Sequence, residues 1–252
     1  MLKIRRIYSN SVEFIFTYLY SITKIRRIPV VRDLFRIIRF FSIRSIPKTL
    51  YFNFKCLPFK QAVMLPVHVH YKTLLKDTSG KVVLNCRPRF GMIGIGFENG
   101  YKGVSNRGLW EAGGKIVFNG SANIFPGAKI IATGEVHFGE NFSMQTSTII
   151  SRKKIVFGNN CLLSWDCLIM DSDQHPVKEI ETDQQINPPE EVVLGNNIWM
   201  GCRCTVLKGT KIPDDTIIAA NSFLNKKYKG QYQVIGGNPA RILKQNVTWS
   251  YE

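Results

Sequence analysis

The stretch LGNNIWMGCRCTVLKGTKIPDDTIIAANSFL, residues 194–224, repeats with a period of six residues. Each unit begins with an aliphatic side chain, and its fifth residue is small or β-branched. A period of six matches neither the 3.6-residue period of a helix nor the alternation of a single strand. It predicts a chain that coils, with one short strand and one inward aliphatic residue on each of three sides. The unit heads are Leu194, Met200, Val206, Ile212, Ile218 and Leu224, and the fifth residues are Ile198, Cys204, Thr210, Thr216 and Ser222.

The same period continues, less regularly, toward the N-terminus. The register slips by two residues before Phe138 and by one before Phe157, which predicts small bulges at corners. Corners are also indicated by FGEN (138–141), FGNN (157–160) and LGNN (194–197), because Gly and Asn tolerate the backbone angles of tight turns. The expected heads in this part are Phe118, Ile124, Ile130, Phe138, Met144, Ile150, Phe157, Leu163 and Ile169.

Residues 173–193 (DQHPVKEIETDQQINPPEEVV) interrupt the repeats. They have no period, several acidic residues and three prolines, and regular units lie on both sides. A long insertion in an otherwise regular coil is usually functional. We therefore expect an inserted loop with a role in the site.

The positive charge is concentrated at the N-terminus. The chain has a net charge of +16, and residues 1–60 contribute +11 of it, with thirteen Lys and Arg against Glu13 and Asp33. Residues 1–48 read as a basic amphipathic helical extension, which either lies on an anionic membrane surface or packs on its own domain. Its apolar run is shorter than a membrane span and lacks the pattern of a secretory signal. No nucleic-acid-binding module accompanies the charge, so we expect no nucleic-acid partner.

The remaining boundaries follow from the repeats. Residues 49–117 contain strand-like runs and are expected to be a β-rich cap, residues 118–225 the coil, and residues 226–252 a C-terminal tail or short helix. Six cysteines lack any CxxC pair, which indicates reduced thiols, a cytosolic compartment and no structural metal.

Three segments carry a resemblance to a known family: DSDQHPV (171–177), GNNIWMG (195–201) and GGNPARILK (236–244). In this order they resemble the hexapeptide-repeat acyltransferases, in the branch of maltose, galactoside and surface-polysaccharide O-acetyltransferases. The resemblance covers residues 118–244. It implies a mainly β fold, the left-handed parallel β-helix, and a homotrimer with active sites in the clefts between subunits. It also implies acetyl-CoA as co-substrate and no metal.

The resemblance assigns catalysis to His175, in the family's His-Pro pair. Its imidazole would take the proton of a substrate hydroxyl as the oxygen attacks the thioester carbon of acetyl-CoA. Asp171 and Asp173 would orient the imidazole or bind acceptor hydroxyls, and a turn-forming role is equally open. A glycoside-hydrolase role for two carboxylates lacks a matching context.

The cofactor positions also come from the resemblance. Trp199 would line the acyl site, Cys202 would touch the pantetheine arm, and the backbone of Ala220 would meet the pantetheine amides. Asn225 and Lys226 follow the last regular repeat, where the family has Thr-Lys, so Asn225 departs from the pattern. Arg241 would face the nucleotide phosphates with help from Lys244, unless both belong to a solvated basic tail. A nucleophilic role for Cys202 or Cys204 is rejected, because the family transfers the acetyl group directly.

With the resemblance, these residues predict an acetyl-CoA-dependent O-acetyltransferase acting on a hydroxyl of a sugar or surface-glycan intermediate. The expected location is the cytoplasm, at the inner face of the membrane if residues 1–48 lie on that surface. One alternative keeps the fold and changes the acceptor to the amine of a nucleotide sugar. Another is a non-catalytic β-helix scaffold, which predicts no cofactor binding.

Overall fold

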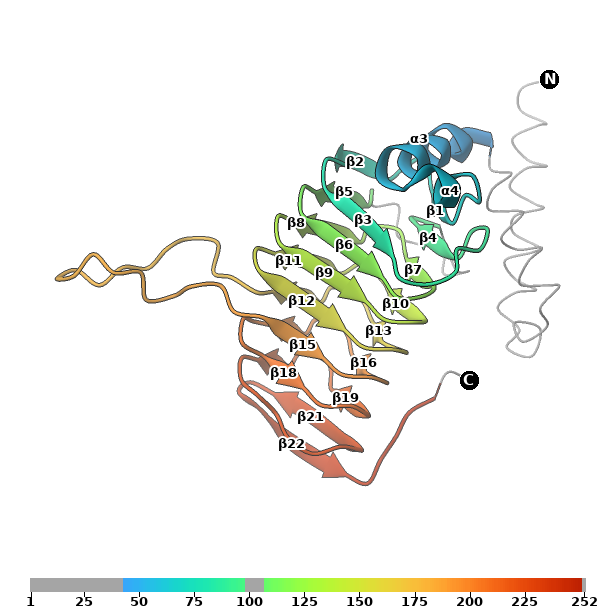
Figure 1. Cartoon of the computed structure of the whole chain (residues 1–252). Helices are drawn as coiled ribbons and strands as arrows, with labels where there is room; N and C mark the ends of the chain where they lie inside the picture. The colour runs from blue at the N-terminus through green and yellow to red at the C-terminus, as the bar shows by residue number, and fades with distance from the viewer. Residues whose placement is uncertain (1–42, 98–106, 251–252) are drawn as a thin grey trace, which may run out of the picture.

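A three-sided coil of short parallel strands makes up most of the molecule (Figure 1). The computed structural model describes residues 43–97 and 107–250. Each side of the coil is one sheet. Sheet 1 contains β1 (Val67–Val69), β4 (Ile93–Ile95), β7 (Ala122–Ile124), β10 (Phe142–Met144), β13 (Leu162–Leu163), β16 (Trp199–Met200), β19 (Thr216–Ile218), β21 (Gln233–Gly237) and β22 (Ala240–Gln245).

The other two sheets complete each turn. Sheet 2 contains β2 (Leu74–Asp77), β5 (Leu109–Ala112), β8 (Lys129–Ala132), β11 (Thr148–Ser151), β14 (Leu168–Met170), β17 (Thr205–Val206) and β20 (Phe223–Leu224). Sheet 3 contains β3 (Lys81–Leu84), β6 (Lys115–Phe118), β9 (Glu135–Phe138), β12 (Lys154–Phe157), β15 (Val192–Leu194) and β18 (Lys211–Ile212). Strands that neighbour each other in a sheet come from successive turns and pair in parallel, as β12 does with β9 and β15. The predicted parallel β-helix is therefore confirmed.

The core is the interior of this coil. All six heads and all five fifth-position residues of the 194–224 repeat are buried, as predicted. One expected head is wrong: Ile149, and not Ile150, points inward. In β11 the buried residues are Ile149 and Ser151, and side chains on a strand alternate between its two faces, so Ile150 lies on the outer face.

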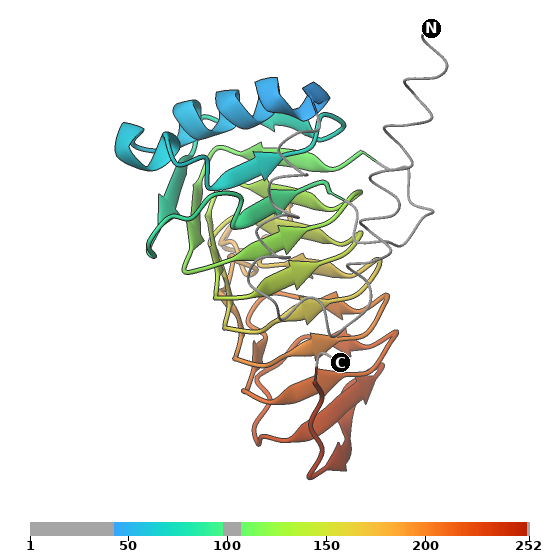
Figure 2. The ribbon, with the colours of Figure 1, turned by 90° about the vertical axis from the view of Figure 1, so that its right-hand side faces the viewer.

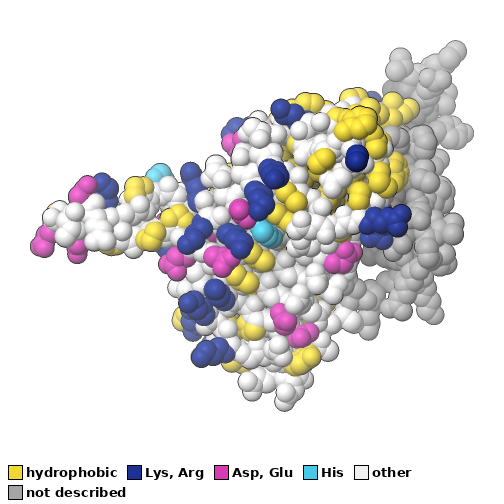
Figure 3. Space-filling model, in the orientation of Figure 1, with side chains coloured by type: hydrophobic (Ala, Val, Ile, Leu, Met, Phe, Trp, Pro, Cys, Tyr) yellow, Lys and Arg dark blue, Asp and Glu magenta, His cyan; other side chains and the backbone are white. Residues whose placement is uncertain are grey.

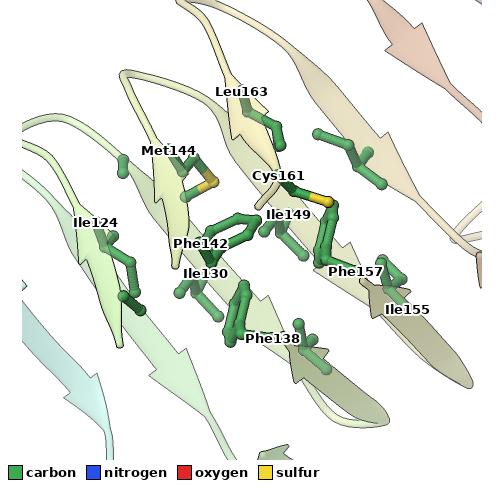
Figure 4. Packing of buried hydrophobic residues seen from close by; sticks show 14 of the residues in the cluster. Ile124, Ile130, Phe138, Phe142, Met144, Ile149, Ile155, Phe157, Cys161 and Leu163 are labelled. Carbon is green, nitrogen blue, oxygen red and sulfur yellow. The ribbon is translucent and has the colours of Figure 1, made fainter. Parts of the chain in front are cut away.

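Phenylalanines fill the middle of the coil (Figure 4). The ring of Phe138 stacks between Phe118 and Phe157, with centroids 5.1 and 5.7 Å away, and Phe142 lies 4.5 Å from it. Residues in register on successive turns thus form a continuous column of aromatic rings, which stabilises the stacking of one turn on the next.

The predicted Gly-Asn corners are confirmed and form a hydrogen-bonded ladder. Asn141, Asn160 and Asn197 all have positive φ, which Asn adopts at lower cost than most residues. One position earlier, Asn159 Oδ1 accepts a hydrogen bond from the backbone N–H of Glu140 in the preceding turn, at 2.8 Å. Asn196 Oδ1 does the same for the N–H of Asn159. The corner side chains therefore satisfy backbone groups that the short strands leave unpaired.

The coil begins earlier than the sequence analysis placed it. Parallel pairing starts at β1, so most of the expected 49–117 cap is the first two turns of the coil. The connections there are longer and irregular, as between β3 and β4, and they hide the six-residue period. The actual cap consists of η2 (Ile43–Ser45), α3 (Ile46–Cys56) and α4 (Phe59–Ala62), and α3 lies across the open end of the coil (Figure 2).

The C-terminal end also differs from expectation. In place of a tail or short helix after residue 226, β21 and β22 form an antiparallel pair that ends sheet 1. Gly237, with φ +102°, and the following Asn238-Pro239 make the tight turn between them. The prediction for residues 1–48 lies outside the described residues, except for residues 43–48. Among the described residues, no helix has both the length and the apolar character that a membrane span requires.

Candidate functional site

A long loop leaves the coil between β14 and β15, at the edge shared by sheets 2 and 3 (Figure 1). It is the predicted insertion, although Val192 and Val193 belong to β15. Its two arms run antiparallel, with an isolated bridge between Lys178 and Gln185. The loop projects away from the body of the coil, so its residues can reach beyond the protomer that carries them.

His175 lies at the base of this loop with its backbone held on both sides. Its N–H donates to the carbonyl of Asp173 at 2.7 Å, and its carbonyl accepts a hydrogen bond from Asn187 Nδ2 at 2.9 Å. The same Asn187 Nδ2 reaches Asp173 Oδ2 at 2.9 Å. These bonds position the backbone of His175 while its side chain is exposed to solvent. An exposed imidazole on a fixed backbone is free to meet a substrate.

Asp171 is fully buried at the corner below the loop. Its carboxylate accepts hydrogen bonds from the backbone N–H groups of Arg152 (2.7 Å) and Lys153 (2.9 Å) and from Ser151 Oγ (2.8 Å). All three partners belong to the preceding turn of the coil. The contacts of Asp171 are those of the turn-forming role that the sequence left open, and they do not include the imidazole of His175.

Asp173 is exposed and forms an ion pair with Lys208 of the next turn, at 2.5 Å. The hydrogen bond from Lys208, followed by that from Asn187, lowers the pKa of the Asp173 carboxyl, so it is ionised at neutral pH. The contacts of Asp173 with His175 are the hydrogen bond between its carbonyl and the His175 N–H, and the shared bonds to Asn187 Nδ2. Direct orientation of the ring by either aspartate stays a prediction.

Sequence reasoning missed Asn187 and Lys208, which hold this base of the loop. Asn187 precedes the Pro188-Pro189 pair, and its Oδ1 also accepts a hydrogen bond from the N–H of Val177 at 2.6 Å. Asn187 therefore connects the two arms of the loop. The prolines were the available signal, because they restrict the backbone where the loop returns to the coil. No signal marked Lys208, whose partner is 35 residues away.

The expected acyl and pantetheine positions lie on a different part of the coil. Trp199 is on the outer face of sheet 1, while Cys202 and Ala220 occupy corners between sheets 1 and 2 in successive turns. Cys202 is partly exposed, and its carbonyl accepts the N–H of Asn221 at 2.9 Å. At Gly201 an added Cβ would lie 2.7 Å from the backbone N of Ala220, so these corners stack closely.

Trp199 has a neighbour that the sequence did not reveal. The ring of Trp249, from the C-terminal segment, lies 6.2 Å from that of Trp199, and its Nε1 donates to the carbonyl of Asn197 at 2.9 Å. Trp199 keeps 39% of its surface exposed. The segment after β22 thus returns along sheet 1 and adds a second indole beside the expected acyl position.

The remaining expected cofactor positions lie in two separate parts of the coil. Asn225 and Lys226 follow β20 at the edge between sheets 2 and 3, which is the edge of the inserted loop, and both are exposed. Arg241 and Lys244 lie on β22, at the end of sheet 1, and are also exposed. Within one chain, His175 and the group Trp199, Cys202 and Ala220 stand on different edges of the coil.

Two expectations concerned thiols and metal. All six cysteines are free thiols, and Cys204 is buried as an inward fifth-position residue, as predicted. Among residues 43–97 and 107–250, no group of three or more His, Cys, Asp or Glu side chains is placed to hold a metal ion.

Comparison with known proteins agrees with the fold and extends it. No protein-family model matches the chain. Over 102 residues the chain is 36% identical to a polysialic acid O-acetyltransferase of Neisseria meningitidis. The matched stretch covers 40% of this chain and 47% of that protein. It is 25% identical over 124 residues to a polysialic acid O-acetyltransferase of Escherichia coli O1:K1, which is 49% of this chain and 39% of the relative. The chain thus spans less than half the length of these two relatives.

A third relative and a solved structure widen the comparison. The galactoside O-acetyltransferase of E. coli K12 is 26% identical over 112 residues, which is 44% of this chain and 54% of the relative. The crystal structure of the polysialic-acid-specific acetyltransferase NeuO superposes with a TM-score of 0.55 at 18% identity, over 73% of this chain and 91% of that one. At that identity the superposition shows the fold alone. In sequence the chain is thus similar to O-acetyltransferases, and its three-sided parallel coil is the left-handed parallel β-helix of the hexapeptide-repeat acyltransferases.

Proposed function

We propose that the chain is an acetyl-CoA-dependent O-acetyltransferase that modifies a hydroxyl of a sugar or surface glycan. The observation that carries the proposal is the base of the inserted loop, where Asn187 and the Asp173 carbonyl fix the backbone of an exposed His175. A group with these properties can remove a proton from an acceptor that arrives from solvent. The relatives that act on polysialic acid and galactosides support a sugar hydroxyl as the acceptor.

In the proposed reaction, an imidazole nitrogen of His175 takes the hydroxyl proton while the oxygen attacks the thioester carbonyl of acetyl-CoA. The tetrahedral intermediate collapses with cleavage of the carbon–sulfur bond. The imidazolium then returns its proton to the coenzyme A thiolate, and the acetyl ester is released. No thiol of the protein takes part, in line with the buried position of Cys204.

The proposed site combines two copies of the chain. His175 stands at the edge between sheets 2 and 3, whereas Trp199, Cys202 and Ala220 lie on sheet 1 and at its corners with sheet 2. The loop projects outward, so a neighbouring copy can place its loop against these three residues. A closed trimer would supply three such clefts by symmetry. Trp199, Cys202 and Ala220 would come from one subunit and His175 from the next, with Arg241 and Lys244 toward the coenzyme A phosphates.

Coenzyme A release from acetyl-CoA, with polysialic acid and with a polysaccharide extract as acceptors, tests the activity. His175→Ala should lower the rate by about 10²–10⁴-fold, the usual contribution of a general base. His137→Gln is the matched control, because His137 lies on sheet 3 and Gln preserves a hydrogen bond to Glu135. Equal activity of wild type and His175→Ala would refute the assignment. Mild alkali separates the alternatives, since it releases acetate from an ester and leaves the amide of an N-acetyl product intact.

Mixed oligomers test the shared site. Co-expression of His175→Ala with Ala220→Tyr, each inactive alone, should restore about a quarter of the wild-type activity, because some clefts then receive both intact halves. Absence of any restoration in a proven mixed oligomer would place both halves of the site within one chain. If the protein binds no coenzyme A, the scaffold alternative replaces the enzyme.

A further inference from the structure

The helix that closes the coil buries two polar side chains and leaves several of its large apolar side chains exposed. The buried residues of α3 are Thr49, Phe52 and Asn53, and Ser45 directly before the helix is also buried. The ring of Phe52 packs edge-on against Trp110 inside the coil, with centroids 5.0 Å apart. The residues facing solvent include Leu50, Tyr51 and Phe54. A surface helix normally buries its apolar stripe. α3 departs from this pattern, because it buries Phe52 beside two polar residues and leaves Leu50 and Phe54 exposed.

The buried polar side is explained by the sheet edge beneath it. β1 is the edge strand of sheet 1, and its backbone groups need partners. Asn53 Nδ2 donates to the carbonyl of Val67 at 2.6 Å, and Asn53 Oδ1 accepts the N–H of Val67 at 3.2 Å. Thr49 Oγ1 accepts the N–H of Val69 at 3.0 Å. The inner face of α3 therefore replaces the missing strand of a further turn.

Among the residues that the structure describes, the large apolar side chains left exposed are concentrated at this end of the coil. Residues 43–64, which we call the cap, contain seven of the sixteen exposed large hydrophobic residues among those the structure describes. Phe59, in α4, is 73% exposed, and its ring lies 6.1 Å from that of Phe54, so the aromatic surface continues from one helix to the other. The seven are Ile43, Leu50, Tyr51, Phe54, Phe59, Val63 and Met64. In Figure 3 hydrophobic side chains gather at this end of the molecule, with Lys and Arg at their border.

The positive charge of the cap indicates an anionic partner. Residues 43–64 hold four basic residues and no acidic one. Lys55 and Lys60 are exposed beside the aromatic surface, whereas Lys48 is engaged, with Nζ donating to the carbonyls of Tyr71 (2.8 Å) and Thr73. Residues 1–64 together carry +11 of the net +16. Aliphatic and aromatic side chains bordered by cations match the boundary between acyl chains and anionic headgroups.

We propose that the cap docks on an anionic lipid surface, with Leu50, Phe54 and Phe59 at the level of the acyl chains and Lys55 and Lys60 among the headgroups. The long axis of the coil then points away from the membrane, and the inserted loop lies several turns above it. A lipid surface fits better than an acidic glycan, because Ile43, Leu50, Val63 and Met64 offer apolar area with no polar group to bind sugar hydroxyls.

Co-sedimentation of the full chain with vesicles tests the proposal, independently of acetyl transfer. Vesicles of phosphatidylglycerol with phosphatidylcholine should bind the protein, and phosphatidylcholine alone should bind it far less. Lys55→Glu/Lys60→Glu should weaken binding about thirtyfold or more, because each basic residue near an anionic surface adds to partition. Leu50→Gln/Phe54→Gln/Phe59→Gln should weaken it at least about tenfold even at low salt, where electrostatic attraction is strongest.

Matched variants at the other end of the coil and on the loop control for charge and hydrophobicity. Lys227→Glu/Lys229→Glu makes the same change of net charge, and Ile180→Gln/Ile186→Gln removes two exposed apolar side chains of the loop. Both should bind vesicles like wild type. Cap variants that bind like wild type would assign any binding to another segment and overturn the proposal. A fall in the Tm of the triple variant by more than about 10 °C would also overturn it, because an exposed lipid-facing surface contributes little to folding stability.

Discussion

Replacing Asp171 distinguishes a structural carboxylate from an acceptor-binding one. The side chain is fully buried and accepts three hydrogen bonds, two of them from backbone N–H groups of the preceding turn. Asp171→Ala leaves those donors without their acceptor, at the point where the inserted loop leaves the coil. We expect a loss of folding stability, with any loss of activity following from it.

The magnitude follows from the three bonds. Hydrogen bonds to a charged group contribute about 1.5–3 kcal/mol each, and Arg152 and Lys153 are exposed enough for water to replace part of that. A total of about 3–4 kcal/mol is therefore expected. For a chain of this length, that corresponds to a fall in Tm of about 6–16 °C.

Asp173→Ala is the matched control. It removes a carboxylate two residues away whose ion pair with Lys208 is exposed, and exposed pairs contribute about 0–1 kcal/mol. Urea unfolding at one fixed protein concentration compares the two variants directly. If Asp171→Ala unfolds at the same urea concentration as Asp173→Ala and only loses activity, the structural reasoning is refuted and the catalytic interpretation of Asp171 stands.

Three further outcomes are expected. Phe138→Ala, which removes the central ring of the aromatic column, should cost about 3–5 kcal/mol in urea unfolding, and a cost below 1 kcal/mol would contradict the packing. Burial, followed by nearby Lys72 and Lys48, lowers the pKa of His70 to about 4. Between about pH 6.5 and pH 4 the unfolded chain binds a proton that the folded chain does not. The free energy of unfolding should therefore decrease as the pH is lowered from 6.5 to 4, and His70→Gln should reduce this decrease. Cys202→Ala should keep more than a tenth of the wild-type kcat, because direct transfer needs no thiol, whereas a loss of about 10⁴-fold would indicate a covalent intermediate.

Where the six-residue period is clean, the interior of the coil could be predicted residue by residue. Leu194 to Leu224 place heads and fifth-position residues inward as expected, because inward orientation depends only on neighbours within a strand and its corner. Where a corner changes length, prediction fails by one residue, as at Ile150. In the first two turns the connections are long enough to hide the period, and the start of the coil at Val67 was missed.

The candidate site was only partly readable. His175 and the loop stood out because a break in a regular repeat is a local signal. The contacts that position the loop could not be predicted, since Lys208 pairs with Asp173 from 35 residues away and Ser151 bonds to Asp171 from 20 residues away. Those contacts depend on how turns stack, which follows from the lengths of all the corners between them.

By itself, the sequence determined the coil, its inward side chains and the position of the inserted loop, because each depends on a few consecutive residues. The tertiary structure alone decided that Asp171 supports a corner, that Trp249 lies beside Trp199, and that α3 leaves Leu50 and Phe54 exposed. The last case gives the physical reason most clearly. The apolar character of Leu50 and Phe54 alone predicts that they are buried. The unpaired edge of β1 instead requires Thr49 and Asn53, and their backbone hydrogen bonds, with the packing of Phe52 on Trp110, determine which side of the helix faces the protein.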